Sequence, residues 1–349
     1  MPITIIGAGA IGGTIGAYLA RAGHGVMFCD AAEDHVAAIN NRGLTISGWD
    51  GEFTVGVPAM TPGELRGPLT LVLLAVKAYD TRAAMRTVAP LLADDGVVVS
   101  LQNGLNEQVI AEAIGAERTL GCLVNFSADY LEPGLIHYGG PGVLKIGELD
   151  GRVTARLEQL RELLSAWGVV ETTENIWGYL WGKLGYANML YATALVDASM
   201  AEVIERYRPL MVALASEAYA VAHALGIHPE PFDGVEPGLY YPPEQRDWAA
   251  INRSLDALVA RRRQDQKQRS GIWRDLAVRK RRTEIDEQLV PIVRRAEALG
   301  MALPLTNSVV KRIHDLEQRR AEMSWSHLDE LESLRRAQTL SGDGGSHMI

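Results

Sequence analysis

Cysteine is scarce in this chain, with 2 residues among 349. Cys29 and Cys122 both stand within apolar, strand-like runs, so we expect buried hydrophobic side chains and neither a disulfide nor a nucleophile. The 8 histidines are scattered without the spacing of a metal site, and we therefore expect no bound metal. No apolar run approaches the roughly 18 residues that a membrane span requires, so we expect no membrane partner.

An excess of positive charge is also missing. The formal net charge is -9, which argues against nucleic acid as the main partner and leaves a small-molecule substrate. The sequence begins directly at a strand-like run, without the basic segment and apolar leader of a signal peptide, so a cytoplasmic location is expected. The chain is long enough for two domains, because single cores stop growing at roughly 250 to 300 residues.

The sequence does contain a glycine-rich segment near its start. The apolar run 3–6 leads into Gly7-Ala8-Gly9-Ala10-Ile11-Gly12, and the residues that follow have helical spacing. In this strand, turn and helix, Gly7 permits a positive φ, Gly9 lets the backbone approach a pyrophosphate, and Gly12 allows close packing of the helix. The helix N-terminus would face the phosphates. The predicted cofactor contacts here are Gly7, Gly9, Ala10, Ile11 and Gly12.

The second strand-like run ends in an acidic residue, Asp30, about twenty residues beyond the glycines, as in dinucleotide-binding proteins. A carboxylate at that position accepts hydrogen bonds from the ribose hydroxyls of NAD(H), whereas it would repel the 2′-phosphate of NADP(H). No arginine follows closely. We therefore predict that NAD(H) is preferred over NADP(H). The alternative is that Asp30 caps the next helix.

Strand-like and helical segments alternate up to about residue 175, and the pattern beyond is almost wholly helical. We predict an α/β protein with an N-terminal Rossmann dinucleotide-binding domain over 1–175 and an all-helical C-terminal domain over 176–335. Residues 336–349 are predicted to form a flexible tail. The proline-rich stretch 226–243 is expected to be a surface excursion between two long helices. The helical domain would suit substrate binding and a homodimer interface.

Two apolar runs, 69–76 and 96–101, deliver polar residues to the edge where open α/β sheets bind ligands. Lys77 follows the first run and is a candidate contact to cofactor or substrate. Asn103 follows the second run and could orient a nicotinamide amide or a substrate oxygen, because its side chain both donates and accepts. The alternatives are a solvated loop lysine and a simple Asn-Gly turn.

The helical half carries charged residues in apolar surroundings. Lys183 lies on an apolar helix start, where a lysine is costly unless it is paired or used, or unless it reaches solvent. Glu284 stands beside an apolar helix face, where an ordinary surface salt bridge is the alternative. The run from Arg261 to Arg282 is strongly basic, which is typical of a solvated helix face. A second interpretation is that Arg274 helps to hold a substrate carboxylate, and RNA binding is a distant third.

Taken together, these motifs resemble the ketopantoate reductase family. The similarity covers nearly the whole chain and is carried by the glycine turn, the 76–81 segment, Leu101-Gln102-Asn103-Gly104, Trp181-Gly182-Lys183-Leu184, and the stretch from Ser270 to Asp286. The resemblance implies a Rossmann domain, a helical C-terminal domain and a substrate held between them. It also implies that Lys183 is the general acid toward a keto oxygen and that Glu284 binds a substrate hydroxyl. Lys77 and Asn103 would lie near the nicotinamide.

The sequence also departs from that family. Ala187 and Tyr191 occupy positions at which its members typically carry asparagines, and Asp30 replaces the basic residue usual in NADP-dependent members. Asn188, five residues after Lys183, is kept as a candidate substrate contact. The resemblance also implies a substrate-contacting serine, which Ser270 would match, although the spacing to Glu284 leaves Gly271 as the alternative for that place.

We predict an NAD(H)-dependent oxidoreductase that interconverts a carbonyl and a secondary alcohol on a small keto or hydroxy acid, with an altered substrate pocket. One alternative is a β-hydroxyacid or opine-type dehydrogenase. The other is a dinucleotide-sensing protein without turnover.

Overall fold

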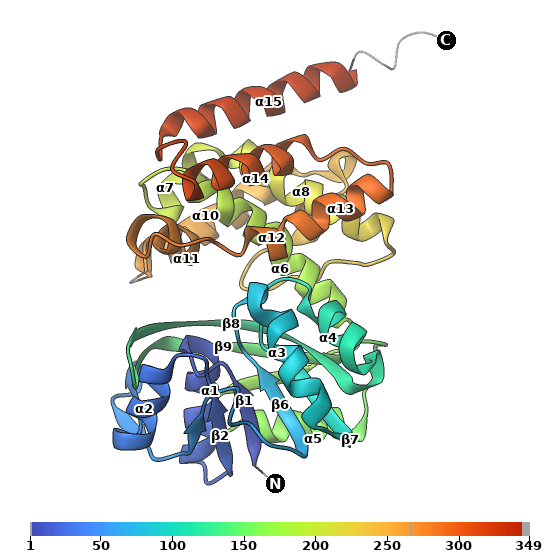
Figure 1. The fold of residues 1–349 in the computed structure, drawn as a ribbon. Helices are drawn as coiled ribbons and strands as arrows, with labels where there is room; N and C mark the ends of the chain where they lie inside the picture. The colour runs from blue at the N-terminus through green and yellow to red at the C-terminus, as the bar shows by residue number, and fades with distance from the viewer. Residues whose placement is uncertain (1, 266, 344–349) are drawn as a thin grey trace. The chain divides into compact units, whose positions relative to one another are not determined.

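The computed structural model describes residues 2–265 and 267–343, and the chain divides into two compact units between Trp177 and Gly178 (Figure 1). The division falls in the first turn of helix α6 (Ile176–Thr193). The first unit is built on a sheet with helices, and the second is helical. This architecture confirms the predicted combination of a Rossmann α/β domain with an all-helical C-terminal domain.

The first unit contains one sheet, which in the described part of the chain has 10 strands in the order β4-β3-β9-β8-β7-β6-β1-β2-β5, with β10 beside β9. Strands β5, β2, β1, β6, β7 and β8 pair in parallel, whereas β8 with β9 and β3 with β4 are antiparallel. The strands are β1 (Ile3–Ile6), β2 (Val26–Cys29), β3 (Leu44–Gly48), β4 (Phe53–Val55), β5 (Ala59–Met60), β6 (Leu69–Leu74), β7 (Leu92–Ser100), β8 (Thr119–Glu132), β9 (Leu135–Glu148) and β10 (Val169–Thr172).

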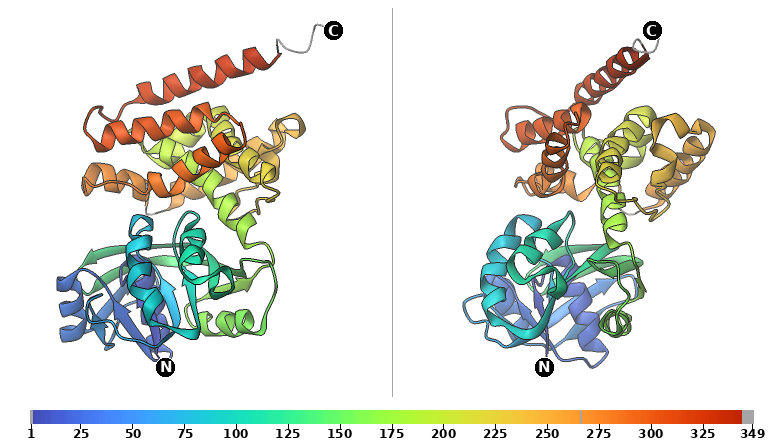
Figure 2. Two further views of the ribbon diagram at one scale, coloured as in Figure 1. Left: turned by 45° about the vertical axis from the view of Figure 1, so that its right-hand side comes forward. Right: turned by 90° about the vertical axis from the view of Figure 1, so that its right-hand side faces the viewer.

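Helices cover both faces of the central strands (Figure 2). They are α1 (Ala10–Arg21), α2 (Glu33–Arg42), α3 (Thr81–Val88), α4 (Asn106–Ile114) and α5 (Ala155–Leu164). Successive strand residues point to opposite faces, so neighbours in β6 join different cores: Leu73 packs with the α1 and α5 side, and Leu74 packs with the α3 and α4 side. This double burial explains why β6 is an almost unbroken apolar run.

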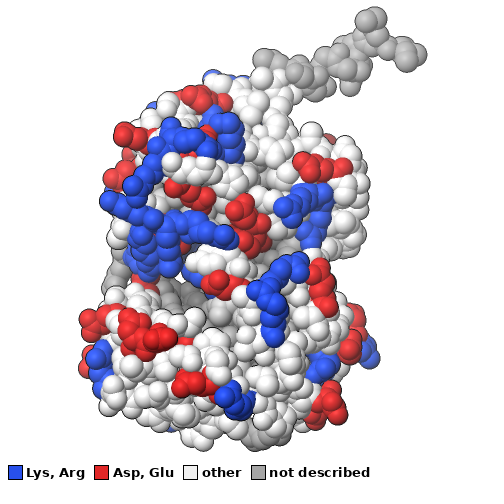
Figure 3. Space-filling model, in the orientation of Figure 1, with Lys and Arg blue, Asp and Glu red and all other residues white. Residues whose placement is uncertain are grey.

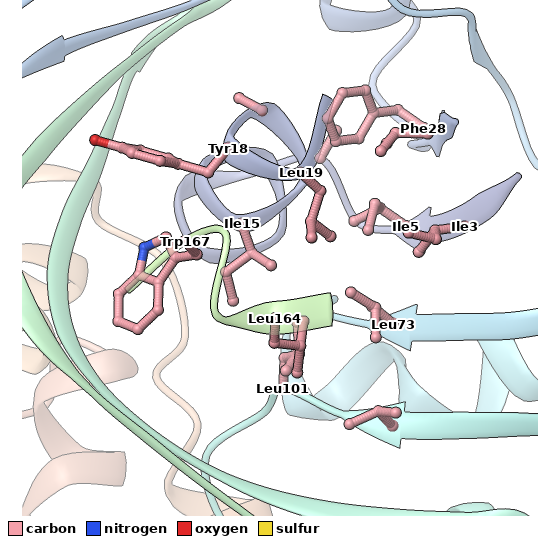
Figure 4. Packing of buried hydrophobic residues seen from close by; sticks show 14 of the residues in the cluster. Ile3, Ile5, Ile15, Tyr18, Leu19, Phe28, Leu73, Leu101, Leu164 and Trp167 are labelled. Carbon is pink, nitrogen blue, oxygen red and sulfur yellow. The ribbon is translucent and has the colours of Figure 1, made fainter. Parts of the chain in front are cut away.

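The packing of α1 against β1 places the glycine-rich turn (Figure 4). Ile15 and Leu19 of α1 and Ile5 of β1 are all completely buried in the same cluster. Gly16 allows this close approach, because a Cβ there would lie 2.5 Å from the ring of Phe28. The helix is therefore held directly against the strand that precedes it.

The second unit is built around α8, which contacts α13, α14 and α15. Trp181, Tyr191 and Tyr219 are among its largest fully buried side chains. Besides α6, its helices are α7 (Met200–Arg206), α8 (Arg208–Ala224), α9 (Pro237–Tyr240), α10 (Trp248–Gln264), α11 (Gly271–Trp273), α12 (Ile285–Gln288), α13 (Val290–Ala298), α14 (Pro304–Glu317) and α15 (Trp325–Asp343). No helix within the described ranges is both long enough and apolar enough to cross a membrane.

Two predictions about this unit need correction. The proline-rich stretch does interrupt the helices, but Val235 and Tyr240 within it are almost fully buried, so it is anchored in the unit and is not only a surface excursion. The predicted tail is also too long, because α15 continues to Asp343. Its residues near 336 are strong helix formers, and Glu332 pairs with both Arg335 and Arg336 one turn away. Residues 344–349 of the predicted tail lie outside the described residues.

Candidate active site

Three glycines of the turn after β1 have different surroundings. Gly7 has a φ of 93°, and a Cβ there would lie 2.8 Å from the backbone of Ala75 and Val76. A Cβ at Gly12 would lie 2.1 Å from the carbonyl oxygen of Gly7. A Cβ at Gly9 would meet nothing within 4 Å. Gly7 and Gly12 are therefore required by the protein's own packing, whereas Gly9 faces open space.

The start of α1 leaves backbone donors at this open space. Gly9 is the N-cap and supplies no side-chain hydrogen bond, and Gly9, Ala10 and Ile11 are all half-buried. The first N–H groups of a helix have no partner within it, and the helix dipole favours a negative charge there. These residues can hold a phosphate group.

Asp30, directly after β2, supports the turn with both carboxylate oxygens. Oδ2 accepts a hydrogen bond from the N–H of Ala8 at 2.7 Å, and Oδ1 accepts one from the N–H of Ala32 at 2.9 Å. Helix α2 begins at Glu33 with Ala32 as its N-cap, so Asp30 is not the helix cap that was considered as the alternative. Each carboxylate oxygen keeps a further acceptor position, which a ribose hydroxyl could use.

His35 of α2 contacts the same turn, although no sequence pattern indicated this role. Its ring is almost fully buried, with Nε2 2.9 Å from the carbonyl oxygen of Ala8 and Nδ1 2.9 Å from the N–H of Gly134. A carbonyl only accepts and an amide N–H only donates, so Nε2 donates to Ala8 and Nδ1 accepts from Gly134. Asp30 and His35 thus bind the backbone N–H and the carbonyl oxygen of Ala8.

Strand register brings the predicted cofactor-binding loops to one edge of the sheet. Ile6 pairs with Leu74, and Leu74 pairs with Ser100, so the glycine turn and the loops after β6 and β7 leave adjacent strands at the same end. Lys77 is half-buried in the first of these loops, and Asn103 is exposed in the second. This edge of the parallel strands is where open α/β sheets bind ligands.

In the second unit, α6 places Lys183, Ala187 and Tyr191 on one face, since they are four residues apart. Lys183 is half-buried, whereas Tyr191 is completely buried. Burial raises the pKa of Tyr191 well above 10, and the negative charges of Glu284 and Glu317 raise it further. The carboxylate of Glu284 therefore acts electrostatically on Tyr191, two helical turns beyond Lys183 on α6.

The segment that carries Glu284 is fixed by its neighbours. Glu284 is only 9% exposed, and it immediately precedes α12. The preceding residue, Thr283, donates from its N–H and its hydroxyl to Oε1 of Glu317 on α14, at 2.6 and 2.7 Å. The backbone on the N-terminal side of Glu284 is therefore tied to a neighbouring helix.

Two of the predicted substrate contacts serve the packing of the second unit. Asn188 is completely buried, and its Nδ2 donates to the Leu214 carbonyl and to the Thr306 hydroxyl, both at 2.8 Å, joining α6, α8 and α14. Asn188 follows Lys183 by five residues, which rotates its side chain by about 140° around the helix axis, so it lies away from the face that carries the lysine. Ser270 is buried and caps α11 by accepting from the N–H of Trp273 at 3.1 Å. Both side chains thus have partners within the protein, and their contact with a substrate stays a prediction.

The basic run from Arg261 to Arg282 is mostly paired with acidic groups, and Figure 3 shows Lys and Arg side chains gathered on one face with Asp and Glu close by. Arg261 and Arg262 both pair with Asp233 of the proline-rich stretch. The others pair as follows: Arg263 with Glu205, Arg269 with Asp197, Arg279 and Arg281 with Asp275, and Arg282 with Glu287. Arg274 is half-buried in the π-helical turn after α11.

Both cysteines are buried, as predicted, and burial raises the pKa of the Cys29 thiol to about 11. Within the described ranges, no three His, Cys, Asp or Glu side chains are grouped so that they could hold a metal ion.

Comparisons with known proteins agree with this arrangement. Residues 3–151 match a family model described as ketopantoate reductase PanE/ApbA, and residues 175–317 match the model of the same family's C-terminal region. A curated 2-dehydropantoate 2-reductase of Mesorhizobium japonicum is 31% identical over 255 residues, which cover 65% of this chain and 77% of that protein.

Solved structures are similar over most of the chain. A PanE/ApbA family ketopantoate reductase of Ralstonia eutropha is 29% identical, with a TM-score of 0.76 and coverage of 91% of this chain and 99% of that one. A D-mandelate dehydrogenase solved with NADH and anilino(oxo)acetate is 22% identical, with a TM-score of 0.78 and the same coverage, which shows a shared fold.

Proposed function

This chain belongs to the ketopantoate reductase family of NAD(P)-dependent oxidoreductases acting on CH–OH groups, as its motifs predicted, and we propose that NAD(H) is its cofactor and a small keto or hydroxy acid its substrate. The observation that carries the proposal is the glycine turn, open at Gly9 and held by the Asp30 carboxylate. A carboxylate at this position can accept hydrogen bonds from ribose hydroxyls and would repel the 2′-phosphate of NADP(H).

The cofactor preference can be tested by comparing the affinity for NADH and NADPH. Asp30→Asn is the suitable variant, because its amide oxygen can still accept from the N–H of Ala8 while the negative charge is removed and only the exposed bond to the N–H of Ala32 is lost. We expect tighter NADH binding in the unchanged protein and a smaller difference in the variant. Tighter binding of NADPH by the unchanged protein would overturn the preference.

In the proposed reaction, Lys183 moves the proton. NADH held by the glycine turn and Asp30 would supply a hydride to a carbonyl carbon. Negative charge then develops on the carbonyl oxygen, where the Lys183 ammonium can stabilise it and donate a proton. In the opposite direction a neutral Lys183 amine takes the proton from the alcohol. Glu284 would accept a hydrogen bond from a substrate hydroxyl and so orient the molecule.

Lys183→Met tests this role, with Lys311→Met as the matched control, because Lys311 also lies on a helix but is 73% exposed and pairs with Asp315. Loss of general acid–base catalysis is expected to lower kcat by about 100- to 10,000-fold, without changing NADH affinity. The control should retain wild-type turnover. If Lys183→Met keeps its turnover, the lysine is not the proton donor.

We propose that the substrate differs from ketopantoate, because Ala187 and Tyr191 replace asparagine amides expected on the Lys183 face of α6. An apolar wall would suit a hydroxy acid with a less polar substituent, and the similar fold of a D-mandelate dehydrogenase supports including aromatic hydroxy acids in a screen. The experiment is a panel of aliphatic, aromatic and pantoate-like hydroxy acids with NAD, followed by absorbance of the reduced nicotinamide. NADH binding without turnover of any panel member would point to a sensing protein.

We also propose that the protein is a homodimer located in the cytoplasm. The second unit offers several long helices, among them α8, α10 and α15, and packed helix faces are common subunit interfaces. Light scattering would test the assembly, and cell fractionation would test the location.

A further inference from the structure

We propose that Thr81, Gln102 and Asn106 form a buried hydrogen-bond network that positions Lys77 and Asn103 as one unit. These three are positioning residues, since they act through the two loops at the cofactor edge of the sheet. The kinetic consequence rests on the proposed NAD(H)-dependent function, whereas the coupling of the two loops does not.

The network joins two segments that are separate in sequence. Thr81 begins α3 in the segment after β6, and Gln102 and Asn106 lie in the segment after β7. Nε2 of Gln102 donates to the Val76 carbonyl at 2.9 Å and to the Thr81 hydroxyl at 2.8 Å. Val76 immediately precedes Lys77, so one amide group of the second loop holds the backbone from which Lys77 extends.

The connection continues from Thr81 to Asn103. The Thr81 hydroxyl lies 2.9 Å from Oδ1 of Asn106, and Nδ2 of Asn106 donates to the Asn103 carbonyl at 2.7 Å. The same hydroxyl lies 2.7 Å from the Ala78 carbonyl, so its single proton is shared between two acceptors. Because the Asn103 carbonyl can only accept, the orientation of the Asn106 amide is fixed, and its oxygen must face Thr81.

Burial makes this arrangement specific. Thr81, Gln102 and Asn106 are between 1% and 5% exposed, so water does not readily replace a bond that is lost. Both loops also begin at paired strand ends, where Leu74 faces Ser100. The strands fix where the loops start, and the three side chains fix the backbone of Val76 and Asn103 a few residues later.

A substitution that displaces one loop should therefore also displace the other. If Lys77 and Asn103 contact the nicotinamide end of the cofactor, their displacement would misplace the reacting atoms, and a misplacement of about 1 Å can cost about 100-fold in rate. We expect variants that break the network to lower kcat/KM for NADH by about 10- to 100-fold.

Thr81→Val tests the proposal, because valine keeps the branched shape and removes the hydroxyl. Thr193→Val is the matched control: Thr193 is also buried, and its hydroxyl also donates to the carbonyl three residues earlier, at 2.7 Å from Leu190. The two threonines thus share a local bond, but only Thr81 joins two loops. Thr81→Ser should restore the network, and Gln102→Met provides a second disruption should Thr81→Val not fold.

Two measurements give the result. Hydrogen exchange of the unliganded protein should show faster exchange in 77–80 and 103–106 together in Thr81→Val or Gln102→Met, and in neither segment in Thr193→Val. Kinetics with NADH should show the loss of kcat/KM in the same variants, with recovery in Thr81→Ser.

Faster exchange in only one loop, or equal effects of Thr81→Val and Thr193→Val, would overturn the network. Joint exchange of both loops in a protein that binds no NADH would support the network and refute the proposed function.

Discussion

Alanine at Gly12 and alanine at Gly9 should separate the packing role of the turn from its ligand role. At Gly12, the added Cβ would lie 2.1 Å from the Gly7 carbonyl oxygen and 2.8 Å from the Cβ of Ala75. The first neighbour is backbone, and the second is a methyl group that no rotation can move aside, so α1 must move away from β1 by about 1 Å to restore ordinary contact.

The expected cost follows from these contacts. Overpacking of a close-packed site costs about 1 to 3 kcal/mol, and a clash with backbone belongs at the upper end. Alanine has a better helix propensity than glycine by about 1 kcal/mol, which offsets part of the strain. Gly12→Ala should therefore destabilise the first unit by about 2 kcal/mol, or roughly 30-fold in its unfolding equilibrium.

Gly9→Ala should behave in the opposite way. Its φ is -70°, which alanine adopts freely, and a Cβ there meets no protein atom within 4 Å. We expect a stability change within about 0.5 kcal/mol. The methyl group would project into the space where a pyrophosphate approaches the backbone, so NADH affinity should fall about tenfold or more.

Urea unfolding, followed by a probe in the first unit, gives the stability of each variant, and fluorescence titration gives its affinity for NADH. The reasoning is refuted if Gly12→Ala is as stable as the unchanged protein. It is equally refuted if Gly9→Ala binds NADH without loss.

Three further predictions concern buried polar groups. Burial alone would raise the pKa of Glu148, but hydrogen bonds from Arg156 and Thr154 lower it below its ordinary value. The ion pair therefore stabilises the fold at pH values above the ordinary carboxylate pKa. This contribution is lost as the pH falls through the lowered pKa of Glu148. Arg156→Met should therefore cost about 2 kcal/mol at pH 7 and less below about pH 4, as measured by urea unfolding at both pH values. Thr306→Val should destabilise the second unit by about 2 kcal/mol in thermal or urea melts, because it leaves buried partners unpaired. Asn188→Ala should likewise lower the melting temperature while leaving KM for the substrate unchanged; a raised KM with normal stability would support its predicted role in binding.

Sequence patterns were sufficient where the physical cause was local. The turn at Gly7 and Gly12 was predictable because strand, turn and helix follow one another directly, and β6 was predictable because burial on both faces leaves no polar position. The α/β and helical division of the chain and its enzyme family followed from such patterns and are confirmed. The catalytic roles of Lys183 and Glu284 stay predictions.

Patterns failed where partners are distant in sequence. His35 contacts Ala8 and Gly134, which lie 27 and 99 residues away, so nothing adjacent to it reveals its task. Asn188 presented a polar group near the lysine in sequence, but its acceptors come from α8 and α14. The network from Gln102 to Asn106 was hidden for the same reason, although Gln102 stood within a recognised motif.

Ala8 has both of its backbone polar groups hydrogen-bonded, its N–H to Asp30 and its carbonyl oxygen to His35. It therefore has no polar group left for a guest molecule, and an incoming phosphate must find its first free donor farther along the chain, from Gly9 onward. We therefore expect two side chains outside the glycine motif to set how closely a bound nucleotide approaches the turn. A protein with identical glycines but neither of these side chains should bind the same nucleotide at a different distance from the turn.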